Sequence, residues 1–110
     1  MLKEKIAIEQ AKEAFVNVAK GKEFTCAEIK EIVGNKNFIP SDYCYNRSND
    51  GINIERNIVE CLCLFIYVER NCYKYVGTDY LYEGDFWHNP KGGKEYIAGK
   101  IKNRRVIWNN

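Results

Sequence analysis

The sequence predicts an α+β domain of winged-helix character, in which N-terminal helices precede a small antiparallel sheet. Two observations predict it. Helical periodicity and helix-start signals fill residues 1–55, and strand patterns rich in β-branched and aromatic residues fill residues 56–110. The order of a long helix, two short helices and a hairpin is that of a winged helix. A chain of 110 residues has the length of one domain, so we take residues 1–110 as a single unit.

Composition limits the classes of protein that this chain can represent. At 45% hydrophobic and 14% aromatic residues, it is too apolar for a disordered chain. Its length leaves no room for a nucleotide-binding domain beside a substrate domain. The longest apolar run is eight residues, 61–68, far short of the ~20 that cross a membrane. The N-terminus carries charges where a signal peptide needs an apolar core, so we expect a cytoplasmic protein without membrane contact.

The first predicted element is an amphipathic helix over residues 3–20. Its apolar positions recur near helical spacing, with lysine and glutamate between them: Leu2, Ile6, Ala11, Phe15 and Val18. Lys20 suits the last turn of a helix, and Gly21 suits the left-handed position after it.

The second predicted helix begins with an unusually complete start signal. Thr25 and Glu28 form a T-x-x-E capping box, in which each side chain satisfies a free backbone donor of the other residue. Phe24 before the cap and Ile29 after it can form a hydrophobic staple. Gly34 is expected to end this helix after about two turns.

A third helix is predicted over residues 41–47. Pro40 precedes Ser41, which suits the cap, and Asp42 places a negative charge in the first turn. The Ser-Asn-Asp-Gly run of residues 48–51 would stop it. Together with the second helix, this segment is expected to form a helix-turn-helix.

Strand patterns follow. Residues 58–68 are predicted to pair antiparallel with residues 72–76 across a three-residue loop. Residues 80–82 and 86–87 suit further short strands, and residues 90–93 a turn. The tail, 95–108, fits either a helix or an edge strand.

Five cysteines are present, at positions 26, 44, 61, 63 and 72. An odd number without a secretory signal argues against a disulfide framework. Cys61 and Cys63 are spaced C-x-C, but the sole histidine, His88, does not complete a zinc set. We therefore expect free thiols, no bound metal and no cofactor.

The densest polar cluster is the string PSDYCYNRSNDG, from Pro40 to Gly51. On a recognition helix, Asn46 can pair with adenine and Arg47 with guanine. Three further candidates for nucleic-acid contact come from this string: Ser41, Tyr43 and Asn49. The alternative interpretation is structural, because caps and turns require serine, asparagine and glycine, and the tyrosines can be core residues.

Positive charge gathers in the second half of the chain. Residues 1–55 have a net charge of −1 and residues 56–110 a net charge of +3. Such a skew can mark a surface that contacts phosphates, or merely a solvated tail. The candidates for electrostatic contact with the phosphate backbone of nucleic acid are Arg70, Lys74, Lys91, Lys94, Arg104 and Arg105.

Tyrosine is also frequent in the second half, at positions 67, 73, 75, 80, 82 and 96. An aromatic strand face can stack bases, form a protein interface or simply pack within a sheet. No nucleophile and base form a recognisable catalytic motif. His88 lies three residues after Asp85, which is a weak basis for acid–base chemistry, so we predict no catalytic residues and no enzymatic activity.

Residues 24–93 resemble a family of small bacterial and phage domains. The shared motifs are T-x-x-E-I-K (here residues 25–30), P-S-D-Y-C-Y-N-R-x-N-x-G (40–51), L-F-x-Y (64–67) and Y-K-Y-x-G (73–77). The resemblance implies an association with restriction-type and other bacterial defence proteins. A copy of the domain by itself would then be a DNA-binding module or a phage-encoded inhibitor.

The sequence therefore predicts a non-catalytic module that binds nucleic acid, with duplex DNA as the expected partner and a role in bacterial defence or its regulation. The alternative is a small phage inhibitor, of anti-CRISPR or anti-restriction type, that binds a defence effector protein through the tyrosine-rich strands. Whether the chain forms a homodimer is left open.

Overall fold

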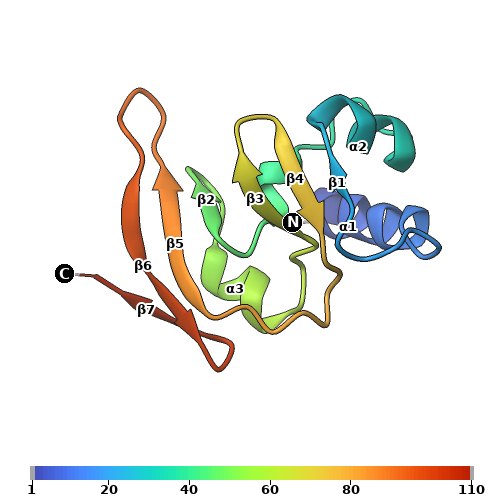
Figure 1. The fold of residues 1–110 in the computed structure, drawn as a ribbon. Coiled ribbons are helices and arrows are strands. Elements are labelled where there is room, and N and C mark those ends of the chain that lie inside the picture. The colour runs from blue at the N-terminus through green and yellow to red at the C-terminus, as the bar shows by residue number, and fades with distance from the viewer. Residues whose placement is uncertain (1, 110) are drawn as a thin grey trace.

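Two β-sheets lie side by side, and the helices pack against them (Figure 1). The computed structural model describes the backbone of residues 2–109 and the side chains of residues 7–109. The first sheet has the strand order β1-β4-β3, and the second has the order β2-β5-β6-β7. The elements are α1 Leu2–Ala14, β1 Glu23–Phe24, α2 Cys26–Val33, the 3₁₀ helix η1 Pro40–Tyr43, β2 Arg47–Asn49, α3 Ile54–Val59, β3 Phe65–Glu69, β4 Cys72–Tyr75, β5 Gly84–Asn89, β6 Tyr96–Lys102 and β7 Arg105–Trp108.

The predicted winged helix, with its helix-turn-helix, is wrong. Seven strands in two sheets dominate the described chain, and its three α-helices are separated by strands rather than grouped before them. The α+β mixture is present, but no pair of consecutive helices forms a recognition unit. Most of the difference between the predicted and the observed fold lies in the first and third predicted helices, over residues 3–20 and 41–47.

The first helix ends earlier than its pattern predicts. It stops at Ala14, and the next turn tightens, since the Val18 N–H donates to the carbonyl of Phe15, three residues back. Phe15 is fully buried and stacks on Tyr75, with 4.7 Å between ring centroids. Packing this ring into the core thus ends the helix six residues before Lys20. Ala11 is buried as expected, whereas the side chains of Leu2 and Ile6 lie outside the described residues.

The structure confirms the predicted start and end of the second helix. The Glu28 N–H donates to Thr25 Oγ1 at 3.2 Å, and the Thr25 N–H donates to Glu28 Oε1 at 2.8 Å. Phe24 and Ile29, the predicted staple, belong to the same buried cluster. Gly34 ends the helix at φ +77°, the left-handed conformation that glycine adopts without strain.

The predicted third helix over residues 41–47 does not form. The chain makes one 3₁₀ turn, η1, and then runs extended beside β3. The Leu64 N–H donates to the Tyr43 carbonyl at 2.8 Å, and the Tyr45 N–H donates to the Phe65 carbonyl at 2.9 Å. Long-range strand pairing therefore replaces the local helix that Ser41 and Asp42 would start.

The strand predicted from residue 58 begins only at Phe65. Residues before it form α3, capped by Asn53, whose Oδ1 accepts from the Arg56 N–H at 3.0 Å. Ile54 and Ile58, four residues apart, bury the same side of this short helix. The hairpin with β4 is antiparallel as predicted, with Phe65 opposite Tyr75.

The C-terminal region is entirely strand and turn. Residues 84–89 form β5, which contains the predicted pair 86–87, whereas residues 80–82 form no strand. The ambiguous tail becomes the hairpin β6–β7, so the strand alternative holds and the helix alternative is wrong. Residues 91–93 turn as predicted.

Two hydrophobic clusters fill the interior. The larger lies between α1, α2 and the first sheet, and includes Phe15, Phe38, Phe65, Tyr73 and Tyr75. The smaller lies between α3 and the second sheet, around Phe86 and Ile101. No helix within residues 2–109 is long and apolar enough to cross a membrane.

Candidate nucleic-acid interface

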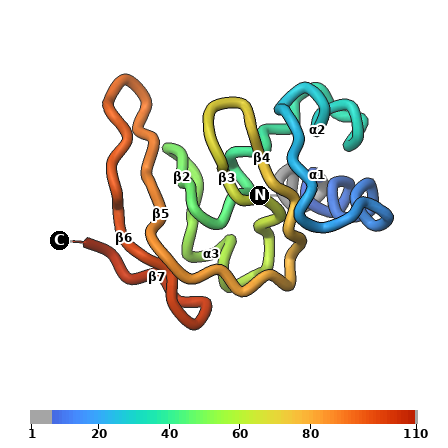
Figure 2. The backbone as a smooth tube through the Cα atoms, viewed as in Figure 1, coloured from blue at the N-terminus to red at the C-terminus, as the bar shows by residue number. Residues whose placement is uncertain are grey.

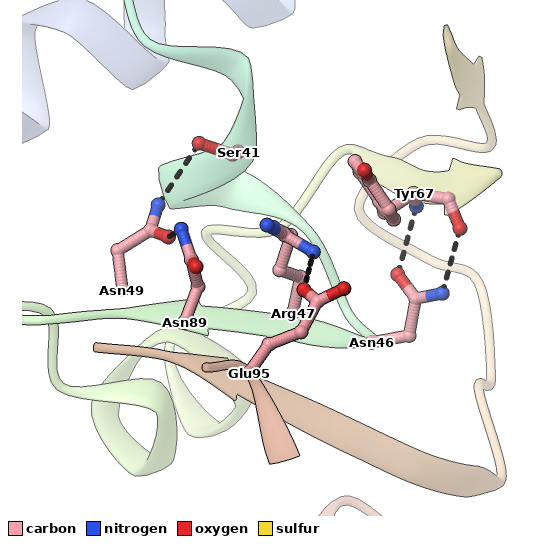
Figure 3. Close-up of polar contacts among 7 residues, drawn as sticks. All are labelled: Ser41, Asn46, Arg47, Asn49, Tyr67, Asn89 and Glu95. Atoms are coloured by element: carbon pink, nitrogen blue, oxygen red, sulfur yellow. Dashed lines mark hydrogen bonds and ion pairs between the residues drawn. The ribbon is translucent and has the colours of Figure 1, made fainter. Parts of the chain in front are cut away.

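Asn46 joins the two sheets. Its Nδ2 donates to the Tyr67 carbonyl at 2.9 Å, and its Oδ1 accepts from the Tyr67 N–H at 2.8 Å (Figure 3). The side-chain amide thus replaces a backbone peptide in the ladder with β3. The backbone of the same residue turns to the other sheet, where its carbonyl accepts from the Trp87 N–H at 3.0 Å. We call residues 43–49 the seam.

Arg47 is the next residue of the seam. Its guanidinium lies 4.1 Å from the centre of the Tyr67 ring, and its Nη1 is 2.5 Å from Glu95 Oε2. Only 12% of the side chain is exposed. Both the aromatic face and the carboxylate attract the guanidinium and hold it in this position.

The remaining candidates from the polar string hold η1 to the second sheet. Asn49 Nδ2 donates to Ser41 Oγ at 2.9 Å, and Asn89 Nδ2 donates to Asn49 Oδ1 at 3.4 Å (Figure 3). Tyr43 is 7% exposed and stacks on Phe38, with 5.0 Å between centroids. The five side chains predicted to contact nucleic acid from this string therefore all have partners within the protein. Base readout by Asn46 and Arg47 stays a prediction. It requires both side chains to give up their partners within the protein and to bind bases instead.

The basic residues that were predicted to contact phosphates lie in three different places in the structure. Arg70 and Lys74 lie on the β3–β4 hairpin of the first sheet. Arg104 contacts the carbonyl of Ile58 at 3.2 Å and the sulfur of Cys61, so it holds the β6–β7 turn to the end of α3. The remaining three are exposed, Lys91 and Lys94 in the loop between β5 and β6 and Arg105 on β7.

A second-sheet face without a covering helix lies opposite α3; we call it the outer face. Partners in an antiparallel register point to the same side, and successive residues alternate. Phe86 and Ile101 point inward to the core, which places Trp87 and Lys100 outward. The outer face is formed by Asp85, Trp87, Ile97, Lys100, Lys102, Arg105 and Ile107.

Sequence reasoning missed most of this face. Trp87, Ile97 and Ile107 are 40%, 38% and 50% exposed, although each has a residue type that usually favours burial. A register shift between Phe86 and Trp87 interrupts strict alternation, so the outward positions of β6 could not be read from spacing alone. The lysines at positions 100 and 102 were the feature of the sequence that could have indicated this face.

Gly99 allows the hairpin to close against Phe86. A Cβ at this position would lie 2.2 Å from the Ile107 carbonyl oxygen and 3.0 Å from the Phe86 ring. Any other residue would separate β6 from β7 or displace the ring. Beyond this point, Lys102, Asn103, Arg105 and Ile107 line a shallow hollow of about 500 Å³.

A polar contact holds the β5–β6 hairpin to the turn after β2. Asp50 Oδ2 accepts from the Lys91 N–H at 2.7 Å, and its Oδ1 lies 2.8 Å from His88 Nε2. These contacts, the backbone hydrogen bond above all, hold the pKa of Asp50 below its usual value. His88 therefore pairs with Asp50 rather than with Asp85, and it packs against Tyr96.

The cysteines are dispersed and free of disulfides. Cys44 and Cys63 are buried, and burial raises the pKa of the Cys63 thiol to about 12. A buried thiol with such a pKa is inert at neutral pH. Within the described part of the chain, no three His, Cys, Asp or Glu side chains form a group that could hold a metal ion.

Comparison with known proteins identifies a family. The model of the DUF7225 family, a domain of unknown function, matches residues 5–107. This chain belongs to that family. It is also 44% identical over 66 residues to the uncharacterized protein YnaC of Bacillus subtilis (strain 168), a match that covers 59% of this chain and 23% of that protein. No solved structure matches. The association with defence that the sequence motifs imply stays a prediction.

Proposed function

We propose that this DUF7225 domain binds nucleic acid, without acting on it chemically, through the outer face and the adjoining β5–β6 hairpin. One observation favours this function above others. Four cations between residues 94 and 105 are exposed, and their side chains have no hydrogen-bond or ion-pair partner among the described residues: Lys94, Lys100, Lys102 and Arg105.

Elsewhere, other cations are paired with carboxylates of the same chain. Arg47 pairs with Glu95, and Lys20 pairs with Asp79 at 2.8 Å. On the outer face, Asp85 opposes Lys100 in the register, which leaves Lys102 and Arg105 without a facing carboxylate. Unpaired cations on one surface attract a polyanion, and each phosphate that they neutralise releases a counterion.

The test is a salt titration with fluorescence anisotropy. Fluorescently labelled single-stranded and duplex DNA of the same sequence are titrated with protein at several salt concentrations between about 50 and 200 mM. We expect affinity to fall steeply with salt, and each of Lys102→Gln and Arg105→Gln to flatten the logarithmic slope by about one. Lys36→Gln, at an exposed lysine in the loop after α2, is the matched control and should leave the slope unchanged.

Binding of a protein partner is the second candidate, and the exposed apolar side chains of the outer face favour it. The tyrosines first considered for such an interface do not serve it, since Tyr73 and Tyr75 are 8% and 7% exposed and belong to the core. If neither nucleic acid binds at low salt, the nucleic-acid proposal fails and the protein-partner function takes its place.

A further inference from the structure

We propose that the outer face takes single-stranded nucleic acid, with one base stacked on the ring of Trp87. This inference rests on the function proposed above and specifies its ligand. The shared chemistry of the ligand is an unpaired base beside a phosphodiester chain, which both DNA and RNA provide. The first argument is the arrangement of apolar and charged side chains on this face.

Apolar surface occupies the part of the outer face nearest the seam. Trp87 and Ile97 are register partners on β5 and β6, and both are exposed. The cations lie farther along the same strands, where Lys100 opposes Ile107 and Lys102 opposes Arg105. A ligand that covers both parts must present an apolar surface and phosphates together. Tryptophan offers a large π-face to such a surface.

A single strand provides this combination, and a duplex does not. In a duplex, the faces of the bases are stacked on one another inside the helix, so a flat protein surface meets phosphates and groove edges. An α-helix can read the major groove by entering it. None of the α-helices lies on the outer face, because α3 packs on the inner side of the second sheet and α1 and α2 pack on the first (Figures 1 and 2).

The backbone beneath the Trp87 ring is firmly placed. β5 lies between β2 and β6, so its two edges are both paired. The Trp87 N–H donates to the Asn46 carbonyl, and Arg47 lies beside it in the register. The Arg47 guanidinium lies over the Tyr67 ring of the first sheet. A preorganised platform of this kind loses little conformational freedom when a base stacks on it.

Tryptophan fluorescence provides a direct test, because the chain has two tryptophans, Trp87 and Trp108. Trp108 packs edge-on against Phe86 instead of pointing to the outer face. In a Trp108→Phe variant, oligo-dT and oligo-U of 12 nucleotides should quench the emission of Trp87. In a Trp87→Phe variant, the emission of Trp108 should change little. The two oligonucleotides separate a DNA ligand from an RNA ligand.

Affinity measurements complete the test. We expect Trp87→Ala to weaken single-strand binding by about 5- to 100-fold, the loss of one stacked base, and Trp87→Phe to restore part of it. Duplex of matched length should bind more weakly and be indifferent to Trp87→Ala. A cooperative urea unfolding transition of each variant would show that it folds.

Three results would overturn the proposal. Equal or tighter binding of duplex, or single-strand binding that survives Trp87→Ala, would remove the stacked base while leaving the proposed polyanion binding intact. No binding of either form would remove both, and would favour a protein partner for the outer face.

Discussion

The two sheets use the same residue types for opposite purposes. In the first sheet, Tyr73 and Tyr75 are buried under α1 and α2, in contact with Phe15 and Phe65. In the second sheet, Phe86 is buried, but its neighbour Trp87 is 40% exposed. The difference follows from the number of covered faces, since α3 is short and protects only the inner side. Aromatic content alone therefore does not distinguish core from binding surface; the covering elements do.

The largest effect that this comparison predicts concerns stability. Phe65→Ala and Phe86→Ala each remove a fully buried ring, so each should lower the free energy of unfolding by about 3–5 kcal/mol. Trp87→Ala should cost about 1 kcal/mol or less, because the residue is 40% exposed and belongs to neither buried cluster. Urea unfolding followed by circular dichroism measures all three. A cost for Trp87→Ala equal to that of Phe86→Ala would mean that the outer face belongs to the core.

A smaller effect is expected at the seam. Asn46→Ala leaves the N–H and carbonyl of Tyr67 without their partners, and should lower the free energy of unfolding by about 1–3 kcal/mol. Asn37→Ala, at an exposed loop asparagine, is the control and should change it by less than about 0.5 kcal/mol. The same variants separate a structural role of Asn46 from base readout. A reader of bases would lose affinity at one position of the nucleic-acid site with no loss of stability.

The smallest predicted effect is a loss of stability in acid. The folded-state pKa of Asp50 lies below the ordinary value of 3.8, so the ionised carboxylate stabilises the fold. That contribution is fully present above the ordinary pKa and is lost as the pH falls through the folded-state pKa. Wild type should therefore have a higher urea midpoint than Asp50→Asn at about pH 6, and the two midpoints should converge as the pH falls through the folded-state pKa of Asp50.

Asp85→Asn is the matched control for this comparison. The Asp85 side chain lies exposed on the outer face, and among the described residues no hydrogen bond or ion pair involves its carboxylate. Its midpoint should follow that of wild type across the same pH range. A difference between wild type and Asp50→Asn that persists undiminished in acid would mean that the charge of Asp50 does not hold the hairpin.

Local signals predicted the local structure well. The capping box at Thr25 and Glu28, the left-handed Gly34 and the β3–β4 hairpin all depend on residues close in sequence, and all were predicted. The polar string 40–51 misled the prediction because its cap and turn residues also suit a helix. Its actual conformation depends on contacts with Phe65 and Tyr67, some twenty residues away. The local spacing of apolar and polar residues does not reveal such contacts.

The candidate site was predicted only in part. Lys91, Lys94 and Arg105 were identified from the charge skew, and the structure places them on or beside the second sheet. Arg104 was grouped with them, although it contacts the end of α3. Trp87 was recognised as a strand residue, but its exposure depends on which side of the sheet α3 covers. Such three-dimensional information is absent from composition and spacing.

The seam also determines the order in which this chain can fold. The hairpins β3–β4, β5–β6 and β6–β7 close short loops, and they can form early. The seam pairs in parallel with β5, some forty residues later, and it contacts β3 as well. Like the pairing of β1 with β4, these distant pairings have a large loop-closure entropy, so we expect them to form after the hairpins. We therefore expect the domain to fold and unfold as one cooperative unit, despite its two separate hydrophobic clusters.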